Sequence, residues 1–178
     1  KFIEEINKAR EDFLGFSEKL MEYVKNFEQI KTLINQINQE EIREDLNRTK
    51  EDFEKTSIFF KELHKENIKF QENKQNLIEI DAIKLTIPSE QNKIKTRKFI
   101  EEFTQRFQRE FQNILKFVKA NFSVVHGKPD IAFILFVTKD IHNKRYLFEN
   151  ETKYIGIDCV ENFNDTNFIS IVLAKDDF

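Results

Sequence analysis

The strongest constraint on this chain is the stretch from Phe2 to Leu77, in which apolar residues recur at alternating spacings of three and four. This spacing puts the apolar side chains on one stripe of an α-helix, which is the seam of a coiled coil or of a long helical hairpin. A single helix cannot bury its own stripe, so we expect a second helix, from this chain or another, to cover it. The seam positions are Ile6, Ala9, Phe13, Phe16, Leu20, Tyr23, Phe27, Ile30, Ile34 and Ile37.

The seam predicts a first helix over residues 2–39. Several of its core positions hold Phe, which is bulky for a two-stranded coiled coil that prefers Ile, Val and Leu. We therefore expect a bundle of three or four helices. Gly15 falls on the solvent side of this helix, where it costs about 1 kcal/mol relative to Ala without interrupting the seam.

The helical register fails after residue 37, because its extension would place Glu41 and Glu44 in the core. This offset predicts the turn of a helical hairpin at residues 38–41, and a bent continuous helix is the alternative. A second helix with a more polar seam is expected over residues 42–78. The residues predicted to form the helix-to-helix interface are Phe13, Phe16, Leu20, Tyr23, Phe27, Ile30, Ile34, Phe53, Phe60, Leu63 and Phe70.

From Ile80 the apolar period changes to two, which is typical of strands. Residues 163–178 fit a fifth strand or a closing helix equally well. The run at 131–138 is the most hydrophobic and is predicted to be the central strand. The expected order is a short edge strand over 83–87, a helix over 90–120, and strands over 122–126, 131–138, 145–149 and 153–158.

These elements predict an α+β fold, in which a long N-terminal helical hairpin or coiled coil is followed by a helix packed on a small antiparallel β-meander. We place the domain boundary near residue 80. Residues 1–79 then form a helical stalk or hairpin, and residues 80–178 form the α+β domain.

The charge and cysteine content limit the partners and the compartment. The net charge is −3, with Lys and Glu interspersed, so the chain has no basic field that would capture nucleic acid or an anionic membrane. No apolar run approaches the length of about 18 residues that spans a bilayer. The single cysteine, Cys159, excludes an internal disulfide framework and fits a reducing compartment. We therefore expect an intracellular protein, in the cytoplasm or the nucleus.

The clearest catalytic candidate is Pro129-Asp130 followed by Glu151-Thr152-Lys153, which resembles the PD-(D/E)xK nuclease motif. In that chemistry, two carboxylates on neighbouring strands hold a divalent cation, and the Lys activates or stabilises the attacking water. Here Glu151 has polar neighbours that are typical of a turn. The pattern therefore favours a turn role for Asp130, and a nuclease is a lesser alternative.

Other chemical signals are weaker. His126, Asp140 and His142 do not have the spacing of a known metal site, and Asp158 beside Cys159 disfavours a reactive thiolate. The sequence contains neither a phosphate-binding loop nor a dinucleotide glycine pattern. We therefore predict no cofactor and no metal, and the sequence favours a protein without enzymatic activity.

Several segments near the C-terminus follow a recognisable order: the hydrophobic run 131–136, the turn 139–143, the aromatic segment 146–148, the segment 154–159 with its acid–cysteine pair, and Leu173 followed by residues 176–178. In this order they resemble the globular ends of outer-kinetochore coiled-coil subunits, which carry an RWD-type domain after a long stalk. The resemblance implies a non-enzymatic protein with a heteromeric coiled-coil partner and a protein-binding surface. The turn at 140–145 is shorter than in that family, and the strand expected at 83–87 interrupts the stalk.

The sequence therefore predicts a non-enzymatic scaffold or adaptor. It would pair through its Phe-rich seam with another helical chain or a second copy of itself, and present a small α+β domain to another protein, as in a kinetochore-like assembly. The order of a helix followed by a meander is also that of GAF and PAS domains. A ligand sensor with signalling helices is therefore the alternative, ahead of the nuclease.

Overall fold

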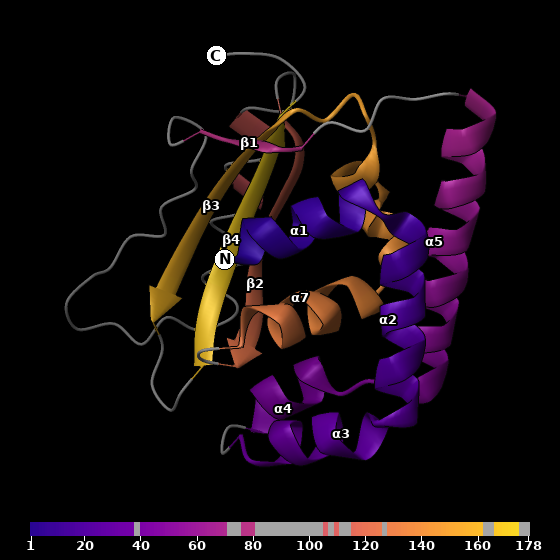
Figure 1. Cartoon of the computed structure of the whole chain (residues 1–178). Helices are drawn as coiled ribbons and strands as arrows, with labels where there is room; N and C mark the ends of the chain where they lie inside the picture. Colours follow the sequence, from indigo (N-terminus) through magenta and orange to yellow (C-terminus); the bar gives the residue numbers. More distant parts are fainter. Residues whose placement is uncertain are drawn as a thin grey trace.

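The computed structural model describes residues 1–37, 40–70, 76–80, 105–106, 109–110, 115–125, 128–161 and 166–174 (Figure 1). The predicted α+β class is confirmed. The described elements are α1 (Phe2–Glu11), α2 (Phe13–Lys25), α3 (Phe27–Asn35), α4 (Glu40–Leu46), α5 (Lys50–Phe70), β1 (Ile78–Glu79), β2 (Leu115–Val125), α7 (Pro129–Thr138), the 3-10 helix η2 (Ile141–Phe148), β3 (Tyr154–Glu161) and β4 (Thr166–Ala174).

The four strands form one mixed sheet in the order β1-β3-β4-β2. β1 runs parallel to β3, whereas β4 runs antiparallel to both β3 and β2. Among the described strands, the last in sequence, β4, therefore lies inside the sheet, between β3 and β2. α1 and α7 lie side by side between the sheet and the pair formed by α2 and α5 (Figure 1).

The helix predicted over residues 2–39 is interrupted twice. The backbone of Asp12, at φ −140° and ψ 86°, leaves the helical conformation between α1 and α2, and Asn26 separates α2 from α3. The Asp12 carboxylate caps α2, because it accepts a hydrogen bond from the Gly15 backbone N–H at 2.9 Å. The prediction of one continuous helix is wrong, although nearly all of the seam side chains lie on the buried side of the three shorter helices.

α2 and α5 pack against each other as an antiparallel hairpin. Ser17 of α2 meets Ser57 of α5 with 2.7 Å between their Oγ atoms, and the Phe13 and Phe60 rings lie 5.9 Å apart one helical turn away. The small serine side chains let the two helices approach closely at this point. Because α3 and α4 connect the two arms, the hairpin is closed by two short helices.

The second predicted helix, over residues 42–78, is also divided. α4 ends at Leu46, and α5 begins after Thr49. Thr49 and Asp52 exchange hydrogen bonds between side chain and backbone N–H, which is a capping box that starts α5. α5 ends at Phe70, and residues 78–79 form β1. The predicted break at residues 38–41 lies between α3 and α4, where residues 38–39 are outside the described part of the chain.

Residues 131–138, predicted to be the central strand, belong to helix α7. Every side chain from Ala132 to Thr138 is buried, so the apolar pattern has no period that separates a helix from a strand. Pro129 opens α7 and Asp130 lies in its first turn. Both features are typical of a helix start, so the interpretation of these two residues as a turn is wrong.

The remaining elements are partly as predicted. The strand over 153–158 is confirmed within β3, and residues 166–174 are a strand rather than a closing helix. The strand predicted over 145–149 is wrong, because this segment lies mainly in η2. The helix predicted over 90–120 is wrong at its end, because β2 begins at Leu115. The strand predicted over 83–87 lies outside the described residues.

One hydrophobic core contains residues from both sides of residue 80. Phe2 of α1 lies 5.7 Å from Phe133 of α7 between ring centroids, and Phe13 of α2 lies 6.1 Å from Phe148 of η2. The seam of the N-terminal helices is therefore covered by the same chain. The division into domains 1–79 and 80–178 stays a prediction.

A buried arginine joins α1 to the segment that precedes β3. Arg10 is 2% exposed, and its guanidinium donates hydrogen bonds to the backbone carbonyls of Leu147, Glu149 and Thr152 at 2.5–3.3 Å. Burial lowers the pKa of Arg10 to about 10, which leaves it protonated at neutral pH. These bonds hold residues 147–152 against α1 and so fix the position at which β3 begins.

Candidate functional site

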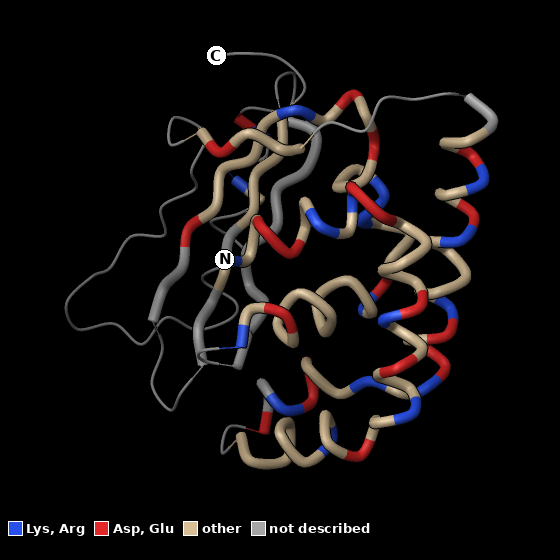
Figure 2. The backbone as a smooth tube through the Cα atoms, in the orientation of Figure 1, with Lys and Arg blue, Asp and Glu red and all other residues tan. Residues whose placement is uncertain are grey.

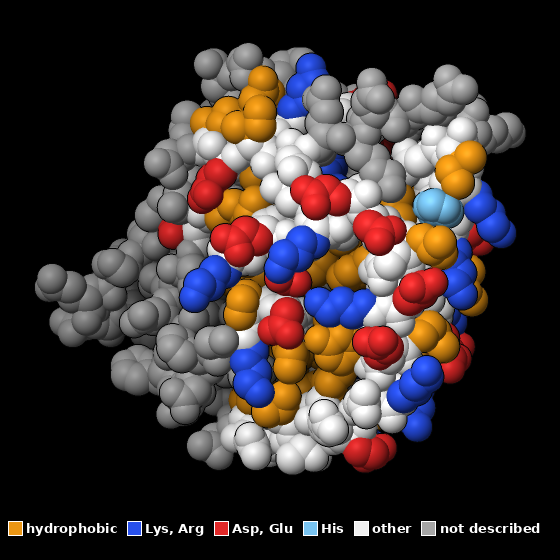
Figure 3. Space-filling model, viewed as in Figure 1, with side chains coloured by type: hydrophobic (Ala, Val, Ile, Leu, Met, Phe, Trp, Pro, Cys, Tyr) orange, Lys and Arg blue, Asp and Glu red, His pale blue; other side chains and the backbone are white. Residues whose placement is uncertain are grey.

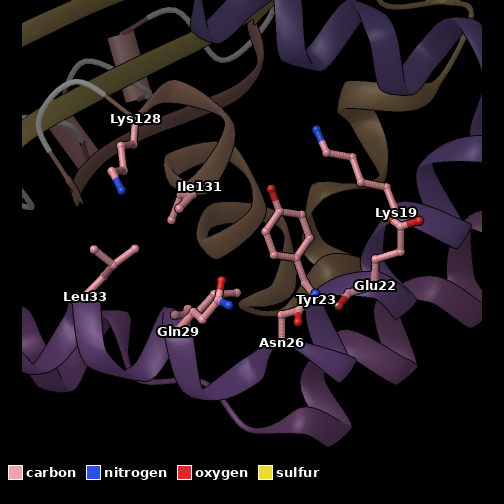
Figure 4. Close-up of a pocket in the computed structure, with 9 residues that line it drawn as sticks. Lys19, Glu22, Tyr23, Asn26, Gln29, Leu33, Lys128 and Ile131 are labelled. Carbon is pink, nitrogen blue, oxygen red and sulfur yellow. Dashed lines mark hydrogen bonds between the residues drawn. The ribbon is translucent and has the colours of Figure 1, made fainter.

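The described residues form a half-open groove of about 320 Å³ between α2, α3 and the start of α7 (Figure 4). We call it the Tyr23 groove. Figure 3 shows hydrophobic side chains gathered on this face of the molecule, with charged side chains around them. The groove is lined by Lys19, Glu22, Tyr23, Asn26, Gln29, Ile30, Leu33, Lys128 and Ile131.

The groove follows from the break in the first helix at Asn26. α3 starts there in a new direction, so the end of α2 and the beginning of α3 form two walls of a corner (Figure 1). The start of α7 supplies the third wall through Lys128 and Ile131. A continuous helix over residues 2–39 would have no such corner.

Tyr23 stands between α2 and α7. Its hydroxyl donates a hydrogen bond to Asp130 Oδ2 at 3.4 Å. Burial raises the pKa of Tyr23 to about 12, and the negative charge of Asp130 adds to this effect. The phenol therefore keeps its proton at neutral pH and acts as a hydrogen-bond donor, which makes it unsuitable as a nucleophile or a base.

The two lysines that line the groove, Lys19 and Lys128, differ in their surroundings. The Nζ atom of Lys19 lies 3.5 Å from Glu5 Oε2, and the same carboxylate is paired with Lys8, whose Nζ lies 2.6 Å from Oε1. Lys128 is exposed, and it has no acidic group within 4 Å among the residues that the structure describes. In Figure 4 its side chain points toward the space between Leu33 and Ile131. Lys128 is therefore a cation at the mouth of the groove, next to apolar surface.

The floor of the groove is apolar and its rim is polar. Ile30 is buried, and Leu33 and Ile131 are half-buried. The side chains of Asn26 and Gln29 are exposed on the rim and can each donate and accept hydrogen bonds. Small-molecule sites combine apolar surface with polar groups that fix the orientation of the ligand. Here six of the nine lining residues are polar or charged and three are apolar.

The charged side chains that line the groove are those of Lys19, Glu22 and Lys128. Its nine lining residues include no Ser, Cys or His, which are the usual nucleophiles and proton carriers. The charged groups nearby belong to ion pairs or lie in solvent. Acidic and basic residues follow one another along the described helices, without a segment of a single sign (Figure 2).

The residues of the nuclease pattern are not brought together. Asp130 follows the end of β2, where Val125 pairs with Thr166. Lys153 donates its backbone N–H to Ala174 at 3.1 Å, at the opposite end of β4. The strand from Thr166 to Ala174 spans about 26 Å at about 3.3 Å per residue. Glu151 is exposed beside Lys153, so Asp130 lies at the far end of the sheet from both.

The other candidate residues are scattered. His142 is exposed and its ring packs against Phe59 at 5.5 Å, and the Asp140 carboxylate accepts a hydrogen bond from Asn143. Cys159 lies in β3, and His126 is outside the described residues. Within the described ranges, no three His, Cys, Asp or Glu side chains are grouped so that they could hold a metal ion.

The residues predicted to form the helix-to-helix interface pack within this chain rather than on its surface. Those with described side chains are buried, except that Tyr23 is half-buried and faces the groove. Phe70 ends α5, and its side chain is outside the described part. None of the described helices is long and apolar enough to cross a lipid bilayer.

Sequence reasoning identified only Tyr23 and Ile30 among the groove residues, and it assigned both to the seam. The available signal was Tyr23 itself, the one seam position of the first helix that carries a polar group. Lys128 and Ile131 were not accessible to sequence reasoning, because the start of α7 was interpreted as a turn and a strand.

No protein-family model, curated protein or solved structure matches this chain. Its function is therefore inferred from the geometry of the Tyr23 groove alone.

Proposed function

We propose that this protein is a non-enzymatic binding module that holds a small ligand in the Tyr23 groove. The observation that carries the proposal is the lining of the groove, where three aliphatic side chains and the Tyr23 ring are combined with two amides and three charged side chains, of which Lys128 and Glu22 are exposed. Its volume of about 320 Å³ is at the lower end of the range of about 300–1,000 Å³ for small-molecule sites.

This proposal develops the ligand-sensor alternative rather than the scaffold that pairs through its seam. The seam side chains that would meet a partner helix are 0–6% exposed for Phe13, Phe27 and Phe60. They already pack against α5, α7 and η2, so a second chain is not needed to cover them. In contrast, the groove leaves apolar and polar groups accessible at one place.

The test is a ligand-observed NMR screen of small organic fragments against the wild-type protein and two variants. Gln29→Trp places a large side chain on the exposed rim and narrows the groove without touching the core. Ile68→Trp is the matched control, because Ile68 is 66% exposed on α5 and is not part of the groove. We expect fragments that bind the wild type and the control to lose binding in Gln29→Trp. If Gln29→Trp binds the same fragments as the wild type, or no fragment binds, the proposal is wrong.

A further inference from the structure

We infer that the ligand of the Tyr23 groove is a small organic carboxylate with an apolar body, and that Lys128 binds the carboxylate. This inference rests on the proposed function and adds the chemical class of the ligand. It follows from the position of one cation beside the apolar part of the groove.

The charged groups around the groove differ in whether they already have a partner. Lys19 pairs with Glu5, which it shares with Lys8, and Asp130 accepts the hydrogen bond of Tyr23. Glu22 is exposed on the α2 side. Lys128 is the cation whose side chain points toward Leu33 and Ile131 in Figure 4. A ligand whose body covers these two apolar side chains would therefore place its polar end at Lys128, where a negative charge is favoured.

The donors of the groove favour a singly charged anion. The groove has two ammonium groups, of which Lys19 pairs with Glu5 and only Lys128 has no described carboxylate within 4 Å, and no arginine is among its lining residues. Phosphate groups carry nearly two charges and are usually held by several donors or by a bidentate arginine. One lysine with nearby amide donors matches a singly charged carboxylate. The small volume of the groove limits the apolar body to a short chain or a single ring.

The Tyr23 hydroxyl and its partner Asp130 affect where a carboxylate can bind in the groove. Its proton is directed to Asp130, so the phenol ring presents its apolar face to the groove while its polar end is occupied. The ring then adds to the apolar surface made by Ile30 and Leu33. The carboxylate is thus drawn to the Lys128 side of the groove rather than to the Tyr23 side, where Asp130 would repel it.

The experiment compares three probes of the same length: hexanoate, hexanamide and hexylamine. Binding is followed by the amide chemical shifts of Gln29, Leu33 and Ile131 at low and at physiological salt. We expect hexanoate to bind about two- to five-fold more tightly than hexanamide, the range of an exposed ion pair, with the preference reduced by salt. Hexylamine should bind most weakly.

Two lysine variants identify the group responsible. Lys128→Gln should remove the preference for hexanoate and leave the affinity for hexanamide unchanged. Lys61→Gln, an exposed lysine on α5 outside the groove, should change neither. If hexanamide or hexylamine binds as well as hexanoate, or if Lys128→Gln keeps the preference, the ligand class is wrong.

The outcome separates this inference from the proposed function. Fragments that are lost in Gln29→Trp, together with equal binding of hexanoate and hexanamide, would support the groove and reject the carboxylate. Failure of all three probes together with an insensitive fragment screen would reject both.

Discussion

At the scale of single residues, buried polar groups decide how this fold is locked. Arg10 donates hydrogen bonds to the backbone carbonyls of Leu147, Glu149 and Thr152. Arg48, also buried, donates to the carbonyl of Leu135 in the last turn of α7 at 2.9 Å. Both side chains act on backbone groups of segments that are distant in sequence, which spacing along the chain cannot reveal.

Tyr23 gives a pH prediction. Its pKa is raised from 10.0 to about 12 in the folded chain, so the unfolded chain releases the phenol proton at a lower pH than the folded one. The contribution of Tyr23 to stability is therefore complete below about pH 10 and is lost as the pH rises toward 12. A titration followed by the ultraviolet absorbance of tyrosinate should show a late-ionising component that belongs to Tyr23.

The substitution Tyr23→Phe should remove this late component and flatten the loss of stability in urea unfolding above pH 10. Tyr146→Phe is the control, because Tyr146 is 42% exposed and lies on η2. If the late component persists in Tyr23→Phe, the assignment of the raised pKa to this phenol is wrong.

At the scale of elements, the boundary between α1 and α2 depends on Asp12 and Gly15. A Cβ atom at position 15 would collide with Asp12 Oδ2, and that carboxylate accepts the hydrogen bond that caps α2. The absence of a side chain at position 15 therefore allows the Asp12 carboxylate to cap α2. This differs from the sequence interpretation, in which Gly15 was a tolerated residue on the solvent side.

We predict that Gly15→Ala gives almost no net stabilisation in the native background, because the gain of about 1 kcal/mol in helix propensity is offset by loss of a cap of about 1 kcal/mol. In an Asp12→Ala background the cap is already absent, so the same substitution should stabilise by about 1 kcal/mol. Urea unfolding of the four proteins in this cycle measures the difference. Additive effects would show that Gly15 and Asp12 are not coupled.

The sequence predicted helices well where one face of the helix is buried and the other is exposed to solvent. The seam positions of α2 and α5 were predicted because their polar faces make the helical period visible. α7 was predicted as a strand because it is buried on all sides. The corner of the Tyr23 groove was missed because the apolar spacing runs through Asn26 unchanged, while only the backbone turns.

At the scale of the whole molecule, described phenylalanines of α1, α2, α5, α7 and η2 form one connected group of ring contacts. The Phe16 ring lies 4.8 Å from Phe60 and 5.5 Å from Phe133, so it joins α2 to both α5 and α7. The sequence predicted which of these side chains in α2 and α5 are buried. It could not show that the helices close on each other and on α7, because the same seam serves an internal or an external partner.

We predict that Phe16→Ala lowers the free energy of unfolding by about 3–5 kcal/mol, the usual cost of removing a buried Phe. Because Phe16 contacts both halves, helix content by circular dichroism and tyrosine fluorescence should be lost in one shared transition. Ile68→Ala, at an exposed site on α5, should change stability by less than about 0.5 kcal/mol. Two separated transitions would instead support independent domains divided near residue 80.

The central place of β4 in the sheet has a consequence for synthesis on the ribosome. β2 and β3 are both translated before β4, yet each pairs with β4 and not with the other. Until residues 166–174 emerge from the exit tunnel, these two strands keep open edges that could capture a strand from a neighbouring nascent chain. The described sheet is therefore completed only after residues 166–174 have been translated, and termination before residue 166 should yield a product that aggregates.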